Sequence, residues 1–199
     1  AVPVEYCVAR LSLRGLRGGH SGVDIHEERG NAIKLLVRVL HELAAKFPFR
    51  LAGLQGGSAR NALPREASAT IALPPGALAE LPTWLGQMQA GLRLELSGVD
   101  EGLLLEALPD QATRVMALAE QEVWLASLHA APHGVRRMSR QVPGVVETSN
   151  NLGMVDLQAD GGSCNFMVRS LLAGGSIALA DEIVSLFALS GTRAEKSGY

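Results

Sequence analysis

A cluster of histidine and carboxylate side chains lies near the start of the chain, at His20, Asp24, His26, Glu27 and Glu28. Imidazole and carboxylate groups bind first-row metals, and the glycine-rich stretch around His20 can bend to bring them together. The spacing differs from the H-E-x-x-H pattern of a zinc-binding helix, and no second cluster elsewhere completes a site. The alternative is a solvated loop before a helix, where the helix dipole stabilises carboxylates. Spacing alone favours the loop, because a zinc site needs three or four converging ligands.

His20 stands between Gly18-Gly19 and Ser21-Gly22, at the end of a predicted strand, where backbone can approach a ligand closely. An imidazole there can donate a hydrogen bond to negative charge that develops on a carbonyl oxygen. The alternative is a turn histidine that bonds its own backbone. His129 and His133, in contrast, flank a predicted helix end, where a positive charge suits the dipole.

Two further polar positions are candidates for binding a carboxylate. Arg60-Asn61 precedes a predicted strand within a turn rich in Gly and Pro, and Arg169 interrupts an apolar strand. The guanidinium group presents a rigid fork of donors that matches a carboxylate. The alternative places Arg169 on the solvent face of an edge strand.

Several function classes are excluded or disfavoured by what the chain lacks. It has no Walker loop and no G-x-G-x-x-G, and Gly19-His20-Ser21-Gly22 is out of register for a serine nucleophile elbow. The formal net charge is −2, and only four Phe, two Trp and two Tyr are present, which disfavours nucleic-acid binding. Cys7 and Cys164 are predicted to be buried strand thiols. Without a signal layout or a long uncharged apolar run, the sequence predicts a cytoplasmic protein with no membrane partner.

Periodicity predicts the elements that must position these residues. Alternation at Ala9, Leu11 and Leu13 predicts a strand, and a helix is expected from Asn31 to Pro48. Strands are expected over 49–54 and 66–73, then a helix from Leu81-Pro82 and a short strand over 92–96.

The second half is predicted to follow a junction over 97–108. Asp110 is expected to cap a long helix that runs to Leu128. A hairpin of 145–157 and 164–172 turns at Asp160-Gly161-Gly162, and a last helix covers 176–189.

Strands joined by both hairpins and helices predict an α+β fold. We expect a two-layer sandwich in which helices pack on one face of a mainly antiparallel sheet. Its first half, 1–98, is expected to be a ferredoxin-like βαββαβ core. The second half, 109–199, is expected to be a pseudo-repeat of the same helix–strand–strand–helix order.

Four stretches in the right order resemble the aminoacyl-histidine dipeptidases, also called peptidase D or Xaa-His dipeptidases. These stretches are the segment from Gly15 to Gly22, Gly30-Asn31-Ala32 with Lys34-Leu35-Leu36, the segment from Arg60 to Ala72, and the segment from Gly144 to Ser149. Spaced matches continue over almost the whole chain to Ser197-Gly198-Tyr199.

The resemblance implies that residues 1–199 are the lid, or dimerisation, domain of a zinc metallopeptidase related to carnosinases and aminoacylases. Two zinc ions are implied in a catalytic domain absent from this chain, so none is expected to be bound here. The two ends of the sequence are expected to be points where an inserted domain leaves and re-enters a larger enzyme. The implied partners are that catalytic domain, a second copy of the chain and a dipeptide substrate.

The same resemblance implies roles for four residues. His20 matches the lid histidine that polarises the scissile carbonyl, and Arg169 matches a lid arginine that binds the substrate carboxylate. Asn61 and Asn151 are implied as polar lid contacts. The metal hypothesis for His20 to Glu28 is then disfavoured, and the fragment is expected to be inactive alone.

Two other functions remain as alternatives. One is a small-molecule binding or regulatory α+β module with no hydrolytic role. The other is a self-contained metal hydrolase that uses His20, His26, Glu27 and Glu28.

Overall fold

Alternating apolar residues define the inner face of the sheet. In β1 (Cys7–Arg14), Ala9, Leu11 and Leu13 are buried, whereas Arg10 and Arg14 are exposed. The inner residues pack beneath the helices and build the core, while the outer residues leave the opposite face polar. The predicted alternation is confirmed.

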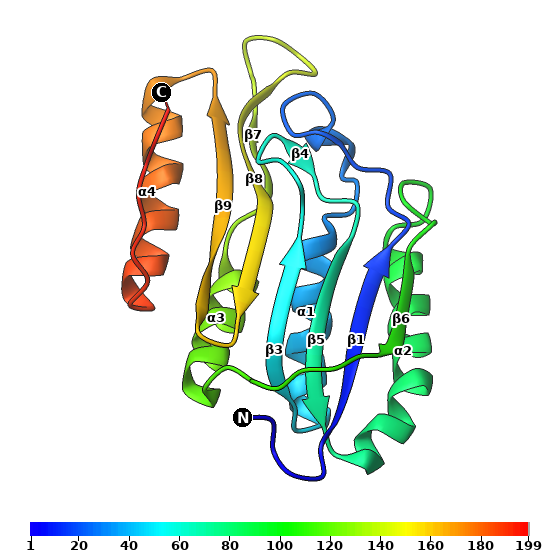
Figure 1. The fold of residues 1–199 in the computed structure, drawn as a ribbon. Helices are drawn as coiled ribbons and strands as arrows, with labels where there is room; N and C mark the ends of the chain where they lie inside the picture. Colours follow the sequence, from blue (N-terminus) through cyan, green and yellow to red (C-terminus); the bar gives the residue numbers. More distant parts are fainter. Residues whose placement is uncertain (199) are drawn as a thin grey trace.

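The computed structural model describes residues 1–198 and contains, within them, a seven-stranded sheet and four α-helices (Figure 1). The α+β class and the mainly antiparallel sheet are confirmed, whereas Tyr199 lies outside the described residues. After β1 the elements are β2 (Gly19–His20), a 3-10 turn (Ile25–Glu27), α1 (Ala32–Lys46), β3 (Arg50–Gly56), β4 (Ala62–Leu63), β5 (Ala67–Leu73), α2 (Pro75–Glu95), β6 (Leu104–Pro109), α3 (Leu118–Ala130), β7 (Gly134–Met138), β8 (Val146–Gln158), β9 (Gly161–Ser170) and α4 (Ala173–Leu189).

The two halves of the chain share one sheet. The strand order is β6-β1-β5-β3-β8-β7, and β9 pairs with the other side of β8. Residues 53–56 of β3 pair with residues 155–158 of β8, which joins the halves. The second half inserts β7 between α3 and β8, so its order differs from that of the first half, and the ferredoxin-like repeat is not confirmed.

Helix α1 is the central helix of the layer behind the sheet in Figure 1, with α2 and α3 beside it. The side chain of Asn31 caps it by accepting from the backbone N–H groups of Ile33 and Lys34. Lys34 Nζ then donates to three carbonyl oxygens at the end of α3, at 2.7–2.8 Å, and ties the two helices together. Helix α4 packs on β9, where Phe187 contacts Phe166 and also Trp124 of α3.

Three predicted elements were wrong between residues 75 and 117. Helix α2 begins at Pro75 and extends to Glu95, so Leu81-Pro82 lies inside it and the expected strand over 92–96 is helical. The helix starts early because Pro75 already provides the proline of the first turn. The expected junction over 97–108 contains β6, whose Leu105 packs in the core.

Asp110 does not cap α3, which begins only at Leu118. Its carboxylate accepts instead from Thr70 Oγ1 and from the backbone N–H of Gln111, both at 2.8 Å. Residues 110–117 form an extended segment that crosses the near face of the sheet in Figure 1. The hairpin of β8 and β9 and the last helix are confirmed, the helix beginning three residues early.

The position of His133 at a helix end suggested a positive charge, but the structure favours its neutral form. Its Nδ1 accepts from the backbone N–H of Leu152 at 3.3 Å and lies 3.2 Å from the amide of Asn31. Burial, and secondarily the charge of Lys34, lowers the pKa of His133 from 6.5 to about 4. The imidazole is therefore neutral at pH 7.

This depressed pKa predicts a pH-dependent stability. Below pH 6.5 the unfolded chain binds a proton at His133 that the folded chain does not take up until about pH 4. The contribution of His133 to the free energy of unfolding should therefore be fully present above pH 6.5. The free energy of unfolding should fall by about 1–3 kcal/mol as the pH drops to 4. Urea unfolding of wild type and His133→Asn across this range measures the difference. His26→Asn, at an exposed histidine, is the control and should keep the wild-type slope; equal slopes in wild type and His133→Asn would contradict the prediction.

Candidate functional site

A two-residue pairing of backbone brings His20 beside Asn61. Strand β2 pairs with β4, with His20 opposite Ala62, and the backbone N–H of Ser21 donates to the carbonyl oxygen of Asn61 at 2.8 Å. Two turns that lie far apart in the sequence therefore form one surface, from which the side chains of His20 and Asn61 are exposed.

The ring of His20 is oriented by its own turn. The backbone N–H of Gly22 donates to His20 Nδ1 at 3.1 Å. A neutral imidazole whose Nδ1 accepts must carry its proton on Nε2, which is then a donor. The turn histidine that bonds its own backbone is therefore observed, and this bond leaves Nε2–H free to donate to a ligand.

Arg169 of β9 lies against the same turn. A Cβ atom built on Gly22 would come within 3.1 Å of His20 Cε1 and 3.2 Å of Arg169 Cδ and Nε, so both side chains border this glycine. Arg169 is exposed on the polar face of the sheet, and no ion pair or hydrogen bond within residues 1–198 occupies its guanidinium. The structure thus brings His20, Asn61 and Arg169 together.

Asn151 lies beneath this surface. Its exposed fraction is 0%, and its Nδ2 donates to the carbonyl oxygens of Arg60 and Ala62 at 2.9 and 2.8 Å. The loop sits tightly on a bulge of β8, since a Cβ atom on Gly153 would lie 2.7 Å from Arg60 Cα. Asn151 therefore acts on the site through the loop that it holds.

Sequence reasoning singled out Arg60 together with Asn61 but missed Gly22 as part of the site. Arg60 and Arg169 both border a cavity of about 660 Å³ between β9, α4 and residues 192–198. No bond within the described residues occupies the Arg60 guanidinium either. The only sequence signal for Gly22 was its place in the same turn as His20.

The residues from His20 to Glu28 do not form a metal site. Asp24 Oδ2 accepts from the backbone N–H of His20 at 2.7 Å, and Glu27 is bonded to Arg29. Throughout residues 1–198, no three His, Cys, Asp or Glu side chains come together in a way that could hold a metal ion. The zinc ions that the resemblance implies therefore do not fit the residues of this chain.

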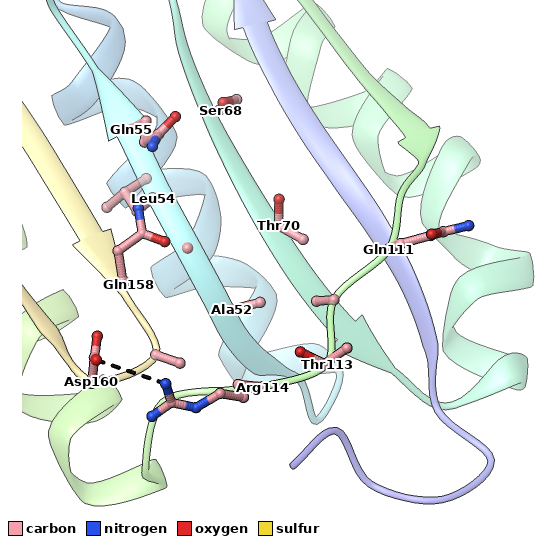
Figure 2. A pocket seen from close by; sticks show the side chains of 13 residues that line it. Ala52, Leu54, Gln55, Ser68, Thr70, Gln111, Thr113, Arg114, Gln158 and Asp160 are labelled. Carbon is pink, nitrogen blue, oxygen red and sulfur yellow. Dashed lines mark ion pairs between the residues drawn. The ribbon is translucent and has the colours of Figure 1, made fainter.

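A second hollow, of about 480 Å³, lies on the open face of the sheet. Figure 2 shows Ser68 and Thr70 of β5 and Gln55 of β3 on its floor, with the extended segment 110–117 along one side. An ion pair of 3.7 Å between Arg114 and Asp160 spans one end. The lining offers hydroxyl and amide groups, which suit a small polar molecule.

Replacing Asn151 by the similarly shaped Leu should destabilise the protein. The carbonyl oxygens of Arg60 and Ala62 would lose their donors inside the structure, at a cost of about 1–3 kcal/mol in the free energy of unfolding. Asn61→Ala is the matched control, since only the backbone of Asn61 holds Ser21, and its effect should stay within about 0.5 kcal/mol. Urea unfolding measures both, and equal losses would refute the distinction between the two asparagines.

The helices described between residues 1 and 198 include none with the length and apolar character needed to cross a membrane.

Known proteins resemble this chain in sequence and in fold. Residues 11–100 match the family model of the peptidase dimerisation domain. The cytosol non-specific dipeptidase of Escherichia coli (strain K12) is 37% identical over 200 residues, covering 100% of this chain and 41% of that protein. The crystal structure of aminoacylhistidine dipeptidase from Vibrio alginolyticus superposes with a TM-score of 0.96 at 38% identity, over 100% of this chain and 41% of that one. The chain thus spans about two-fifths of the length of these relatives. Residues 11–100 thus resemble a peptidase dimerisation domain, and the chain is homologous over its full length to a segment of these two dipeptidases.

Proposed function

We propose that residues 1–199 are the lid and dimerisation domain of a dinuclear-zinc dipeptidase that hydrolyses Xaa-His dipeptides. The observation that carries the proposal is the convergence of His20, Asn61 and Arg169 on one surface, with His20 oriented as an Nε2–H donor. The two halves, 1–98 and 109–199, act as one lid because β3 and β8 pair. The two zinc ions belong to a catalytic domain outside this chain.

Each residue has a distinct role in this proposal. His20 Nε2–H donates to the oxygen of the scissile carbonyl, and this bond strengthens as negative charge develops there. Arg169 binds the substrate carboxylate through its guanidinium fork. Asn61 is a polar contact to the substrate, and Asn151 supports it by holding its loop.

The partners follow from the same assignment. They are the catalytic domain of the same protein, a dipeptide and a second copy of the chain. We place them in the cytoplasm, because the Escherichia coli relative is named a cytosol dipeptidase. Strand β9 pairs only with β8 within the described residues, so its outer edge is open to a second strand. Leu171, Leu172 and Ile177 are exposed at the turn from β9 into α4, which favours this surface for dimerisation.

The second candidate function is a small-molecule binding module. The polar hollow on the open sheet face favours it, because its hydroxyl and amide groups do not belong to the surface around His20. Calorimetry that finds micromolar binding of an amino acid or a nucleotide, abolished by Thr70→Val but retained in His20→Ala, would support this alternative.

A chimaera tests the lid function. In the chimaera, this chain replaces the segment of the Vibrio alginolyticus dipeptidase with which it aligns. The alignment includes the whole of this chain. His20→Ala in the chimaera should lower kcat by about one to three powers of ten with metal content intact, because a donor to the developing oxyanion is lost. Arg169→Ala should mainly raise KM.

Two outcomes would overturn this assignment. One is loss of metal from the His20→Ala chimaera with unchanged kcat per bound metal. The other is turnover of an Xaa-His dipeptide by the isolated chain with added zinc, because the isolated chain should be inactive.

The isolated chain should form dimers through the β9–α4 surface. Leu172→Asp places a charge there while keeping a good N-cap for α4, since Leu172 occupies the cap position. Leu94→Asp, at an exposed leucine of α2, is the matched control. Sedimentation equilibrium should find dimers for wild type and Leu94→Asp and monomers for Leu172→Asp; a Leu172→Asp dimer would exclude this surface.

A further inference from the structure

Two charged residues that the proposed function does not use surround the backbone of His20. We propose that Asp24 and Arg29 are positioning residues, which fix the turn that holds His20 as an Nε2–H donor. The inference rests on the proposed function for its purpose, but its geometry is a property of this chain alone.

Asp24 holds the backbone of His20 at both ends. Its carboxylate Oδ2 accepts from the N–H of His20 at 2.7 Å, and its own N–H donates to the carbonyl oxygen of His20 at 2.8 Å. The second bond closes the turn that contains Gly22. The Gly22 N–H thereby reaches His20 Nδ1, so the ring orientation depends on the Asp24 turn.

Arg29 holds the segment that precedes His20. Its Nη1 donates to the carbonyl oxygen of Gly18 at 2.7 Å, and its Nη2 lies 3.6 Å from Asp24 Oδ1. The side chain of Arg29 is 14% exposed, and that of Asp24 is 23% exposed. A pair this well shielded from water is screened less than a surface ion pair, so it restrains the turn more strongly.

Gly19 shows how closely the two side chains enclose the backbone. A Cβ atom at this position would lie 2.5 Å from Asp24 Oδ2 and 2.6 Å from Arg29 Nη1, and its φ of +143° suits glycine. The space is thus filled by the carboxylate on one side and by the guanidinium on the other. A side chain at residue 19 would therefore have no room while both groups are present.

The far end of this segment is also anchored. The buried carboxylate of Asp100 accepts from the backbone N–H groups of Arg17 and Gly30, each at 3.0 Å. The turn from Arg17 to Gly30 therefore begins and ends at one fixed point. Asp24 and Arg29 are the side chains that determine its path between these ends.

The experiment uses ¹⁵N-labelled chain and needs no substrate. Two-bond ¹H–¹⁵N correlations of the His20 ring show which ring nitrogen carries the proton. Hydrogen exchange measures how well the backbone N–H of His20 is protected from solvent. Wild type should show the Nε2–H tautomer and a protected amide. Asp24→Ala and Arg29→Leu should give a mixture of tautomers and an exchange rate at least about tenfold higher, because the turn opens locally.

Two further variants separate this role from general destabilisation. Asp24→Asn keeps an acceptor for the His20 N–H and should restore much of the protection. Glu28→Gln removes a nearby exposed carboxylate that bonds to nothing described, and it should match wild type. Unchanged His20 tautomer and exchange in Asp24→Ala, or an equal change in Glu28→Gln, would overturn the proposal.

The result is independent of the catalytic assignment. If Asp24→Ala releases the ring as expected while His20→Ala leaves kcat of the chimaera unchanged, the positioning role stands and the proposed function fails. If His20→Ala lowers kcat while the tautomer is insensitive to Asp24, the proposed function stands and the positioning role fails.

Discussion

The hydrogen bonding of β8 is the constraint on which the rest of the structure depends. This strand pairs with β3 at one end, with β7 at the other and with β9 along its opposite side. It therefore joins the two halves of the chain and also fixes both parts of the candidate site. Arg169 is set by its register opposite Ser149, and the loop of Arg60 and Asn61 is held by Asn151. A one-residue shift of β9 against β8 would move Arg169 to the other face of the sheet and separate it from His20.

The structure carries unsatisfied polar atoms in β8 and next to His20. Ser21 Oγ, Asn150 Oδ1 and Asn151 Oδ1 are buried without a hydrogen-bond partner in the described protein. Each such group costs about 1–3 kcal/mol relative to a satisfied one. An apolar side chain at residue 151 would avoid that cost but could not hold the backbone of Arg60 and Ala62. The placement of Asn151 under the loop is consistent with a site whose geometry matters more than local stability.

The sequence predicted the elements whose apolar spacing is regular and missed those defined by other forces. The strand around Leu11, the helix after Asn31 and the last hairpin could be predicted, because their apolar residues recur with a regular period and their ends carry capping or turn residues. Strand β7 was missed because four of its five residues are exposed, so burial leaves no pattern in them. Among site residues, the resemblance indicated His20 and Arg169, but no periodicity could show that both border Gly22 or that Asn151 is buried. Those facts depend on pairing between distant segments.

The chemistry of the assembled surface is one-sided. His20 presents Nε2–H, and Arg60 and Arg169 present guanidinium donors that nothing described occupies. The nearby carboxylates of Asp24 and Glu27 bond to the His20 backbone or to Arg29, whereas the exposed carboxylate of Glu28 has no bond to the described residues. The donors of this surface can bind an oxyanion or a carboxylate. In the proposed lid function, these donors stabilise charge that a second domain generates, and for that purpose the direction of the His20 ring matters more than its basicity.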